Sequence, residues 1–480
     1  MPLPCSLQAI YPRDYGSIRA IALVTSQTSP TGSSSPRSSR KASSTASSWP
    51  TISAYTTYTR ARQTATRRCY QARNFPSETH CKSKSRLSRP IPHNANSPSL
   101  LISAMASVTE SLAFGITAST TYETSPYALA RKFSTLDHIT RGRVGWNIVT
   151  SFLDSAAKAY GFDEQIPHDE RYARADEYME LAYKLWEGTW TDTAVVKDPV
   201  SGVYSDPSQV RAIEHHGKYF KSTAASQLPA SRQRTPLLFQ AGASSAGKQF
   251  AAKHSEVMFL PGLEAEKTKL IVEDMRKQLV EQGRAPDSIK FIAGILVIVD
   301  ETDEKAQAKY EEYLAQSDLE GVATLFGGWT SNDLSKFTDD EDFAFAAVGG
   351  IQSMISSWSK TVPNSNGLKW TKRRVLQELA LGGAHPRAIG SPTTVADILQ
   401  RWVDVAGVDG FNFSYTVSPG TFEDMIEYLF PELRRRGVIW DEYAVPGGSA
   451  RENYFQDGEG ARLRQGHPGK QYAWTGENQQ

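Results

Sequence analysis

The chain contains one stretch that decides its fold class: SLAFGITASTTYETSPYALARKFSTLDHITRGRVGWNIVT, residues 111–150. Its beginning, Ser111–Ser119, is an apolar run that ends in small hydroxyl side chains, as expected of a buried parallel strand. Pro126 opens a segment, reaching Ile139, with apolar residues near helical spacing, and Arg143–Val149 is the next apolar run. A strand, a helix and a strand in succession predict a parallel sheet.

The same alternation continues along the chain. Residues 168–188 predict an amphipathic helix, whose apolar face contains Tyr172, Ala175, Met179, Ala182 and Trp186. Further strands are predicted at residues 236–241, 256–260, 291–299 and 410–415, and further helices at 266–282 and 421–436. Residues 311–370, rich in Ser, Gly and Asp, predict an insertion. An open doubly wound sheet and a closed barrel both fit this α/β pattern.

The first hundred residues differ sharply from the rest. They hold 14 Lys and Arg but only two acidic residues, a balance of +12, whereas residues 101–480 carry a balance of −11. They also hold all three cysteines, Cys5, Cys69 and Cys81. From residue 25 to residue 68 the sequence is nearly all Ser, Thr, Ala, Pro and Arg, without helical or strand periodicity. This composition predicts a disordered tail, and its Arg-rich, acid-poor character also resembles a mitochondrial transit peptide.

A third interpretation of this segment is a shift of reading frame. Codons of the form NTC encode Phe, Leu, Ile and Val, and read one frame over they begin TC and encode Ser. Codons of the form NAC encode Tyr, His, Asn and Asp, and they shift likewise to Thr. A mis-framed hydrophobic domain therefore reads as Ser- and Thr-rich. Residues 41–59 (KASSTASSWPTISAYTTYT) can be back-translated so that a neighbouring frame reads GKFHGIFMADNISVYDVY, with a strand-like run followed by a turn. We favour this frame hypothesis over a genuine tail.

The composition of the body excludes several classes of protein. Residues 82–480 contain no cysteine, so they form neither a disulfide scaffold nor a thiolate zinc module. The longest apolar run, Phe291–Val299, is far shorter than the ~18 residues that cross a bilayer. The start of the chain does not have the pattern of a secretory signal, and the mildly acidic body argues against nucleic acid as the main partner. We expect a cytoplasmic protein, or a mitochondrial one if the N-terminal segment is genuine.

Hydroxyl and amide side chains end two of the predicted strands. The first strand ends with Thr117, Ser119 and Thr120, and the second with Asn147, Thr150 and Ser151. In a barrel the carboxyl ends of the strands face the active site, so these residues are candidates for a site. Ordinary turn chemistry explains them equally well.

A second group of candidates has the chemistry to hold an anion. His168 and Tyr172 are four residues apart and share a face of the predicted helix. GASSAGKQ, residues 242–249, joins a strand to a helix, where the backbone amides of Ser244 and Ser245 can bind a phosphate. The alternatives are that Tyr172 is a core residue, that His168 is a solvated residue at the start of the helix, and that residues 242–249 form an ordinary turn of small residues. The segment is not a good Walker loop, because Gln249 stands where Ser or Thr must hold magnesium, so a phosphotransferase is a distant hypothesis.

Two further classes of site are not expected. His215 and His216 form a pair in a polar loop without a carboxylate or cysteine at ligand spacing, so we predict no metal there. The chain also contains no G-x-G-x-x-G fingerprint. If the chemistry is redox, this protein is therefore not expected to bind NAD in a Rossmann fold itself.

Several segments resemble the bacterial-luciferase-like flavin monooxygenases, namely FGITASTTYE, ARKFSTLDHITRGRVGWNIVTSFLDSAAKAYG, HDERYARADEYMELAYKLWEG and FQAGASSAGKQFAAKHSEVMF. The likeness continues through residues 390–437 and RENYF, and covers about residues 96–472. It is nearest to the branch that contains nitrilotriacetate monooxygenase component A, pristinamycin synthase and dibenzothiophene sulfone monooxygenase. It implies a (β/α)8 TIM barrel over residues 97–455 and a C-terminal tail at 456–480.

The resemblance also implies a chemistry. Members use FMN that a separate NAD(P)H-dependent flavin reductase has reduced; with O2 the flavin forms a C4a-(hydro)peroxide, which oxygenates a small organic substrate. Members are usually homodimers. Carried over by position, the FMN phosphate would be held by His168, Tyr172, Ser244 and Ser245. The isoalloxazine and ribityl chain would lie along Thr117, Ser119 and Asn147.

The departure from the family lies at the front of the chain. Members begin with a strand, a helix and a second strand that ends in an F-x-A-D-like motif beside the flavin. This chain has residues 1–96 of Ser/Thr-rich sequence there, whereas the neighbouring frame contains IFMAD. A barrel without its first two strands would expose sheet edges and lose one wall of the flavin site. The rival hypothesis is therefore a non-catalytic remnant that no longer binds flavin.

Overall fold

The computed structural model describes residues 7–10, 98–152, 154–242, 244–260, 262–330, 333–341, 369–383 and 385–476. The hypotheses about the N-terminal 96 residues therefore fall, apart from residues 7–10, outside the described part of the chain. Much of the predicted insertion at 311–370 lies outside it as well.

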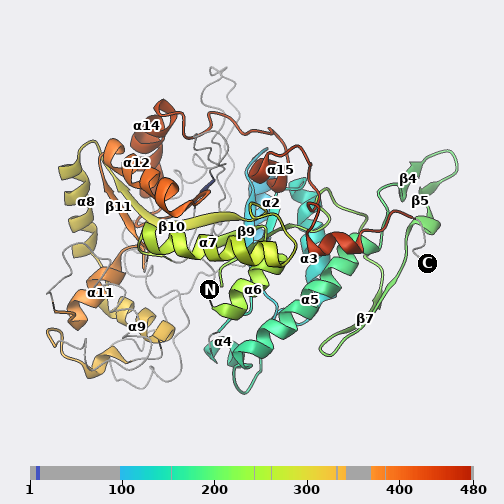
Figure 1. Cartoon of the computed structure of the whole chain (residues 1–480), viewed down its shortest axis with the longest axis horizontal. Helices are drawn as coiled ribbons and strands as arrows, with labels where there is room; N and C mark the ends of the chain where they lie inside the picture. Colours follow the sequence, from blue (N-terminus) through green and yellow to red (C-terminus); the bar gives the residue numbers. More distant parts are fainter. Residues whose placement is uncertain are drawn as a thin grey trace, which may run out of the picture.

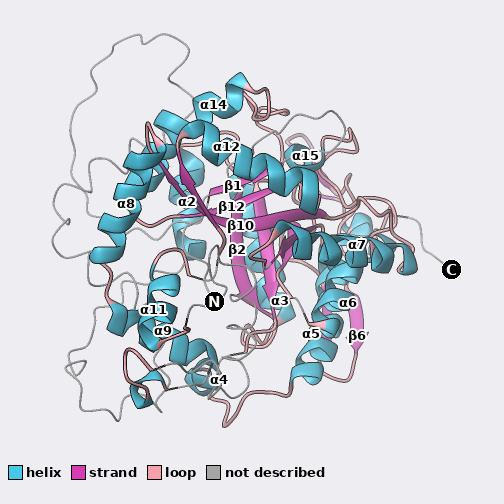
Figure 2. Ribbon diagram, turned by 60° about the vertical axis from the view of Figure 1, so that its left-hand side comes forward, coloured by secondary structure: helices cyan, strands magenta, loops and turns pink. Residues whose placement is uncertain are grey.

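A sheet of mainly parallel strands occupies the centre of the molecule, with helices packed around it (Figure 1, Figure 2). Its parallel neighbours, in order, are β2 (Phe114–Ser119), β3 (Val144–Val149), β8 (Leu237–Gln240), β9 (Val257–Leu260), β10 (Lys290–Val299) and β12 (Gly410–Ser414). β11 (Arg387–Gly390) pairs in parallel with the end of β10, and β1 (Leu7–Ile10) pairs antiparallel with β12.

This strand order decides between the two architectures that the sequence left open. A doubly wound sheet reverses its order at a switch point, whereas a barrel keeps successive strands as neighbours. From β2 to β10 each strand of the main sheet pairs with the next one along the chain, without a reversal. The fold is therefore of the TIM-barrel type, as predicted.

The predicted helices are present, and others join them. Their bounds are α2 (Pro98–Ser107), α3 (Pro126–Thr140), α4 (Asp154–Ala159), α5 (His168–Gly188), α6 (Ser245–His254), α7 (Ala265–Glu281), α8 (Asp303–Ala315), α9 (Leu319–Thr330), α11 (Lys372–Ala380), α12 (Pro392–Arg401), α13 (Gly420–Asp424), α14 (Phe430–Arg435) and α15 (Ala450–Phe455). Short 3-10 or π-helical turns are η4 (Pro207–Gln209), η5 (Leu334–Lys336), η6 (Trp402–Ala406), η7 (Met425–Leu429) and η8 (Pro468–Tyr472). None of the helices in the described ranges is long and apolar enough to cross a membrane.

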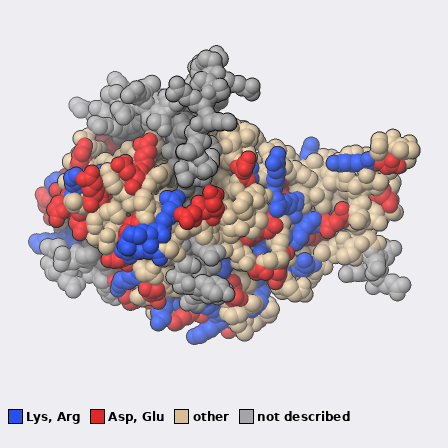
Figure 3. All heavy atoms as spheres, turned by 90° about the horizontal axis from the view of Figure 1, so that it is seen from above, with Lys and Arg blue, Asp and Glu red and all other residues tan. Residues whose placement is uncertain are grey.

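Two small hairpins lie outside the main sheet and were not predicted. They are β4 (Val195–Asp198) with β5 (Val203–Ser205), and β6 (Ile213–His216) with β7 (Lys221–Ala224). The β4–β5 hairpin projects from the body at the right of Figure 1. On the face drawn in Figure 3, basic and acidic side chains are interspersed.

Alternation along each strand separates an outer from an inner face. On β10, Ile295 and Val297 belong to the main hydrophobic cluster together with helix residues such as Met275 of α7. Ile292, which lies on the other face of the same strand, packs with Phe239 in a second cluster. Successive side chains of a strand point to opposite sides, so the first set faces the helices and the second faces the barrel interior.

Aromatic side chains of β8 and β9 pack inside the barrel against α15. The rings of Phe239 and Phe259 stack with centroids 5.6 Å apart, and Tyr454 of α15 meets Phe239 edge-on at 5.6 Å. A Cβ at Gly145 would lie 2.4 Å from Phe239 Cε2, so glycine is needed there. α15 therefore covers this end of the barrel, and in TIM barrels ligand sites lie at the opposite, carboxyl end of the strands.

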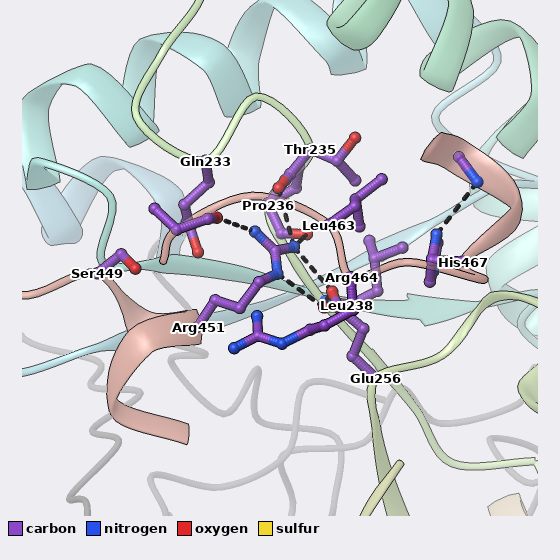
Figure 4. Close-up of polar contacts among 12 residues, drawn as sticks. Gln233, Thr235, Pro236, Leu238, Glu256, Ser449, Arg451, Leu463, Arg464 and His467 are labelled. Carbon is purple, nitrogen blue, oxygen red and sulfur yellow. Dashed lines mark hydrogen bonds and ion pairs between the residues drawn. The ribbon is translucent and has the colours of Figure 1, made fainter. Parts of the chain in front are cut away.

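A buried ion pair ties α15 to the start of the sheet (Figure 4). Arg451 donates through Nε to Glu256 Oε1 at 2.7 Å and through Nη2 to Oε2 at 2.8 Å. Nη2 also donates to the carbonyl oxygens of Thr235 and Pro236, each at 3.1 Å, just before β8. Burial by itself would raise the pKa of the Glu256 carboxyl, but the Arg451 guanidinium lowers it to about 2.

We predict that Glu256→Gln destabilises the protein by roughly 3–5 kcal/mol at pH 7, because Arg451 would remain buried without its counter-charge. The lowered pKa means that the carboxylate stabilises the fold above its ordinary value of 4.5 and ceases to do so as the pH falls towards about 2. The difference between wild type and variant should therefore shrink between pH 7 and pH 3 in urea unfolding. The control is Glu266→Gln, at the exposed pair with Arg401, which should change stability by less than about 1 kcal/mol. Equal effects of the two substitutions would contradict the assignment.

Candidate active site

The ends of β2 and β3 place an amide and a hydroxyl side by side inside the barrel. Thr117 and Asn147 are register partners, and Asn147 Nδ2 donates to Thr117 Oγ1 at 3.0 Å. Trp146, the neighbour of Asn147, packs outward against Phe133 of α3 with ring centroids 5.6 Å apart, so Asn147 points inward. Asn147 is only 5% exposed, and its Oδ1 has no hydrogen-bond partner among the described residues. A buried acceptor without a partner is costly, so Asn147 Oδ1 is a candidate contact for a bound ligand.

Ser119 is engaged in the turn after β2. Its Oγ accepts hydrogen bonds from the amides of Thr121 at 3.2 Å and Tyr122 at 3.3 Å, and Ser151 Oγ donates to it at 2.9 Å. The two strand ends are further joined by Thr121 Oγ1, which donates to the carbonyl of Thr150 at 2.8 Å. Thr120 is buried, and its amide donates to the Val149 carbonyl at 3.0 Å. These contacts are turn chemistry, so a role of Ser119 towards a cofactor stays a prediction.

The starts of α5 and α6 meet at the same end of the barrel. His168 Nε2 lies 3.2 Å from Ser244 Oγ, although the two residues are 76 positions apart. His168 Nδ1 lies 2.7 Å from Asp169 Oδ1, and the carboxylate can only accept, so Nδ1 carries a proton. The neutral ring then accepts from the Ser244 hydroxyl, whereas the protonated ring offers a second N–H to an anion. The Tyr172 ring packs beside His168 with centroids 5.1 Å apart.

Ser244 is the N-cap of α6, and Ser245 is its first residue. Ser244 Oγ accepts from the amide of Gly247 at 3.1 Å. The amides of Ser245 and Ala246 come earlier than the fourth residue of the helix, so they have no acceptor within it and are available to an anion. Ser244 and Ser245 are both exposed at this end of the molecule.

Two glycines allow Tyr172 to reach this turn. A Cβ at Gly242 would lie 2.8 Å from Tyr172 Oη, and one at Gly247 would lie 2.9 Å from it. Gln240 holds the same turn by accepting from the Gly242 amide at 2.7 Å through Oε1. Neither glycine was predicted from the sequence to have a role. The available signal was their position at the two ends of the small-residue run Gly242–Gly247.

A buried network holds α5 and α6 parallel. His254, at the end of α6, contacts Tyr183 Oη through Nδ1 at 3.0 Å and Asp176 Oδ1 through Nε2 at 2.6 Å. Burial would raise the pKa of Asp176, but His254 and Lys253 lower it to about 2. Contacts at both ends of α6 show that the two helices run in the same direction, so their amino termini meet at the barrel mouth.

The predicted candidates thus form two groups. Thr117, Ser119 and Asn147 line the ends of β2 and β3, and His168, Tyr172, Ser244 and Ser245 surround the start of α6. His215 is instead buried 3.3 Å from Glu177 Oε1, at the β6–β7 hairpin. No group of three or more potential metal-ligating side chains occurs within the residues described here.

The parallel barrel, with a helix start exposed at its carboxyl end, defines the fold class, and comparison with known proteins gives the family. The chain belongs to the luciferase-like monooxygenases, whose family model matches residues 77–409. The recognition made from the sequence is therefore confirmed, and with it the assignment to a family of flavin-dependent monooxygenases.

Individual relatives make the likeness specific. The dimethyl-sulfide monooxygenase of Hyphomicrobium sulfonivorans is 47% identical over 377 residues, which is 78% of this chain and 77% of that protein. The long-chain alkane monooxygenase of Geobacillus thermodenitrificans is 45% identical over 377 residues, covering 78% and 80% of the two chains. The crystal structure of DmoA from Hyphomicrobium sulfonivorans superposes with a TM-score of 0.73 at 46% identity, covering 80% of this chain and 79% of that one. The predicted branch is represented by nitrilotriacetate monooxygenase component A of Aminobacter aminovorans, 34% identical over 75% of this chain and 80% of that protein.

We predict that Gly247→Ala destabilises the protein by about 1–3 kcal/mol, because the new methyl group would meet Tyr172 Oη at 2.9 Å and the Gly242 backbone at 3.0 Å. This loss should exceed the gain of up to ~1 kcal/mol that alanine brings inside a helix. Gly420→Ala is the matched control, since its Cβ would meet only Val417 at an ordinary 3.5 Å. Thermal unfolding measures both. An unchanged melting temperature of Gly247→Ala would refute the tight contact.

Proposed function

We propose that this chain binds reduced FMN at the mouth of the barrel and uses it with O2 to oxygenate a small organic substrate. The meeting of His168 with Ser244 at the start of α6 is the observation that carries the proposal. Two similar proteins are named for dimethyl sulfide and for long-chain alkanes, which supports a small substrate of low polarity overall.

The phosphate of FMN fits the turn at α6. His168, Ser244 and the leading amides of the helix are hydrogen-bond donors gathered within one turn, and the helix dipole adds positive potential there. Tyr172 Oη lies against the same turn and can donate as a further group. Ser245 would contribute its backbone amide.

The ring system of FMN fits the inner ends of β2 and β3. Asn147 Oδ1 is buried without a partner, so an N–H of the flavin would satisfy it. Thr117, which already binds Asn147, fixes the orientation of the amide. When bound and reduced, FMN reacts with O2 and supplies the oxygen that is transferred. The chain's own residues bind the cofactor, orient it and exclude water around it.

A separate NAD(P)H-dependent flavin reductase is the proposed partner. The absence of a dinucleotide fingerprint from the sequence supports this, because the chain would then need reduced flavin from outside. A relative named as component A of its monooxygenase is consistent with the same division of labour.

Riboflavin has the ring system of FMN but lacks its phosphate. Comparing the affinities of the two flavins therefore distinguishes residues that bind the phosphate from residues that bind the ring. We predict that His168→Ala and Ser244→Gly each weaken binding of reduced FMN about tenfold to hundredfold, as expected for a lost hydrogen bond to a charged group. Both variants should leave riboflavin binding unchanged. Asn147→Leu should weaken both ligands. The measurement is anaerobic equilibrium dialysis of the full chain.

Ser208→Gly, at an exposed serine in η4, is the control. It should change neither the dissociation constant of FMN nor that of riboflavin. If His168→Ala lost affinity equally for FMN and for riboflavin, the assignment of His168 to the FMN phosphate would be wrong. Failure of the full chain to bind either flavin would favour the rival hypothesis, a non-catalytic remnant of the family. The nucleotide sequence encoding residues 1–100 would then decide whether a chain read in the other frame should be tested.

A further inference from the structure

A second inward-facing polar side chain lies in the barrel, on β12 beside Gly294 of β10. Gly294 of β10 and Asn412 of β12 are register partners. Phe411 and Phe413 pack outward in the main hydrophobic cluster, so Asn412 points into the barrel. In the order of the sheet, β10, β9 and β8 separate β12 from β3, which carries Asn147.

Asn412 has an unsatisfied acceptor. Its side chain is 6% exposed, and within the described residues Oδ1 has no hydrogen-bond partner. Thr416 lies two positions beyond the end of β12. Its Oγ1 is also buried and has no hydrogen-bond partner among the described residues. An unpaired buried acceptor costs about 1–3 kcal/mol, so a native structure keeps one where something else completes it.

An imidazole lies over Gly294, the register partner of Asn412. A Cβ at Gly294 would lie 2.4 Å from His385 Nδ1 and 2.5 Å from Cε1, so the ring of His385 occupies the space that a side chain at 294 would fill. Adjacent strands are about 4.8 Å apart, which places the ring next to Asn412. His385 comes from the segment between α11 and β11, and its ring nitrogens have no hydrogen bond to any described residue.

The protonation of His385 suits a neutral ligand. Burial lowers the pKa of its imidazole, so the ring is neutral at pH 7. A neutral imidazole has one N–H donor and one nitrogen acceptor. Together with Asn412 Oδ1 on the neighbouring strand, His385 therefore offers a donor and an acceptor on the same side of the sheet, a pair that suits a hydroxyl group.

We propose that His385 and Asn412 form a substrate subsite that binds a hydroxyl group of the organic substrate. The proposal rests on the proposed monooxygenase function and deepens it. Such a subsite would favour a substrate with a hydroxyl group over a plain hydrocarbon, because a hydrocarbon would leave both polar groups unpaired in the barrel.

The test compares two probes of the same shape, 1-butanol and n-pentane, by ligand-observed NMR with the full chain. We expect wild type to bind 1-butanol more tightly than n-pentane. His385→Phe and Asn412→Leu should each weaken 1-butanol about threefold to tenfold, the range of one neutral hydrogen bond, and leave n-pentane unchanged. His385→Gln keeps a donor and an acceptor and should retain most of the affinity. His216→Phe, at an exposed histidine, should change nothing.

Thermal unfolding of each variant guards against loss of the fold. Asn412→Leu should melt no lower than wild type, because it removes an unsatisfied buried acceptor. Equal loss of both probes, no loss in either variant, or no preference of wild type for 1-butanol would overturn the subsite. A loss of FMN affinity without loss of 1-butanol would also overturn it, by assigning the residues to the cofactor. If wild type binds 1-butanol selectively but no FMN, the proposed function fails while the subsite stands.

Discussion

The structure depends on one constraint, the alternation of side chains along parallel strands that are joined in sequence order. Every strand of the main sheet from β2 to β12 must bury one face against helices, and this forces the other face into the barrel. On β8 and β9 the inner face carries the aromatic rings of Phe239 and Phe259. On β2, β3 and β12 it carries Thr117, Asn147 and Asn412 instead. The polar strands mark the part of the barrel interior where we place the candidate site.

The helices contribute the second half of the site because they are held in the same direction. The Asp176, His254 and Tyr183 contacts fix the end of α6 against α5, and the glycine turn lets Tyr172 approach the start of α6. His168 and Ser244 then meet although they lie far apart in sequence. The result is an exposed helix start next to a polar part of the barrel interior, an arrangement that suits the proposed phosphorylated cofactor with its ring system. At the opposite end, Arg451 and Glu256 anchor α15 to the start of β8 and β9.

The local pattern of apolar residues in the sequence was sufficient to predict most of the strands of the barrel and several of its helices. Apolar runs predicted β2, β3, β8, β9, β10 and β12, and helical spacing predicted α3, α5 and α7, within a residue or two except at the start of β2. Pattern did not distinguish a barrel from an open sheet, because both alternate strands and helices; the family resemblance and then the strand order did. It missed the β4–β5 hairpin, whose strands are short and mostly exposed. It also missed the Arg451–Glu256 pair, whose partners are 195 positions apart, and His385, whose position over Gly294 has no signal in local spacing.

The central claim is that the start of α6 holds the phosphate of FMN. A crystal structure of the full chain with FMN tests it most directly. The account predicts phosphate density within hydrogen-bonding distance of His168 Nε2, Ser244 Oγ and the amide of Ser245, with the flavin ring beside Asn147. Flavin density elsewhere on the molecule, or a phosphate turned away from α6, would contradict the account.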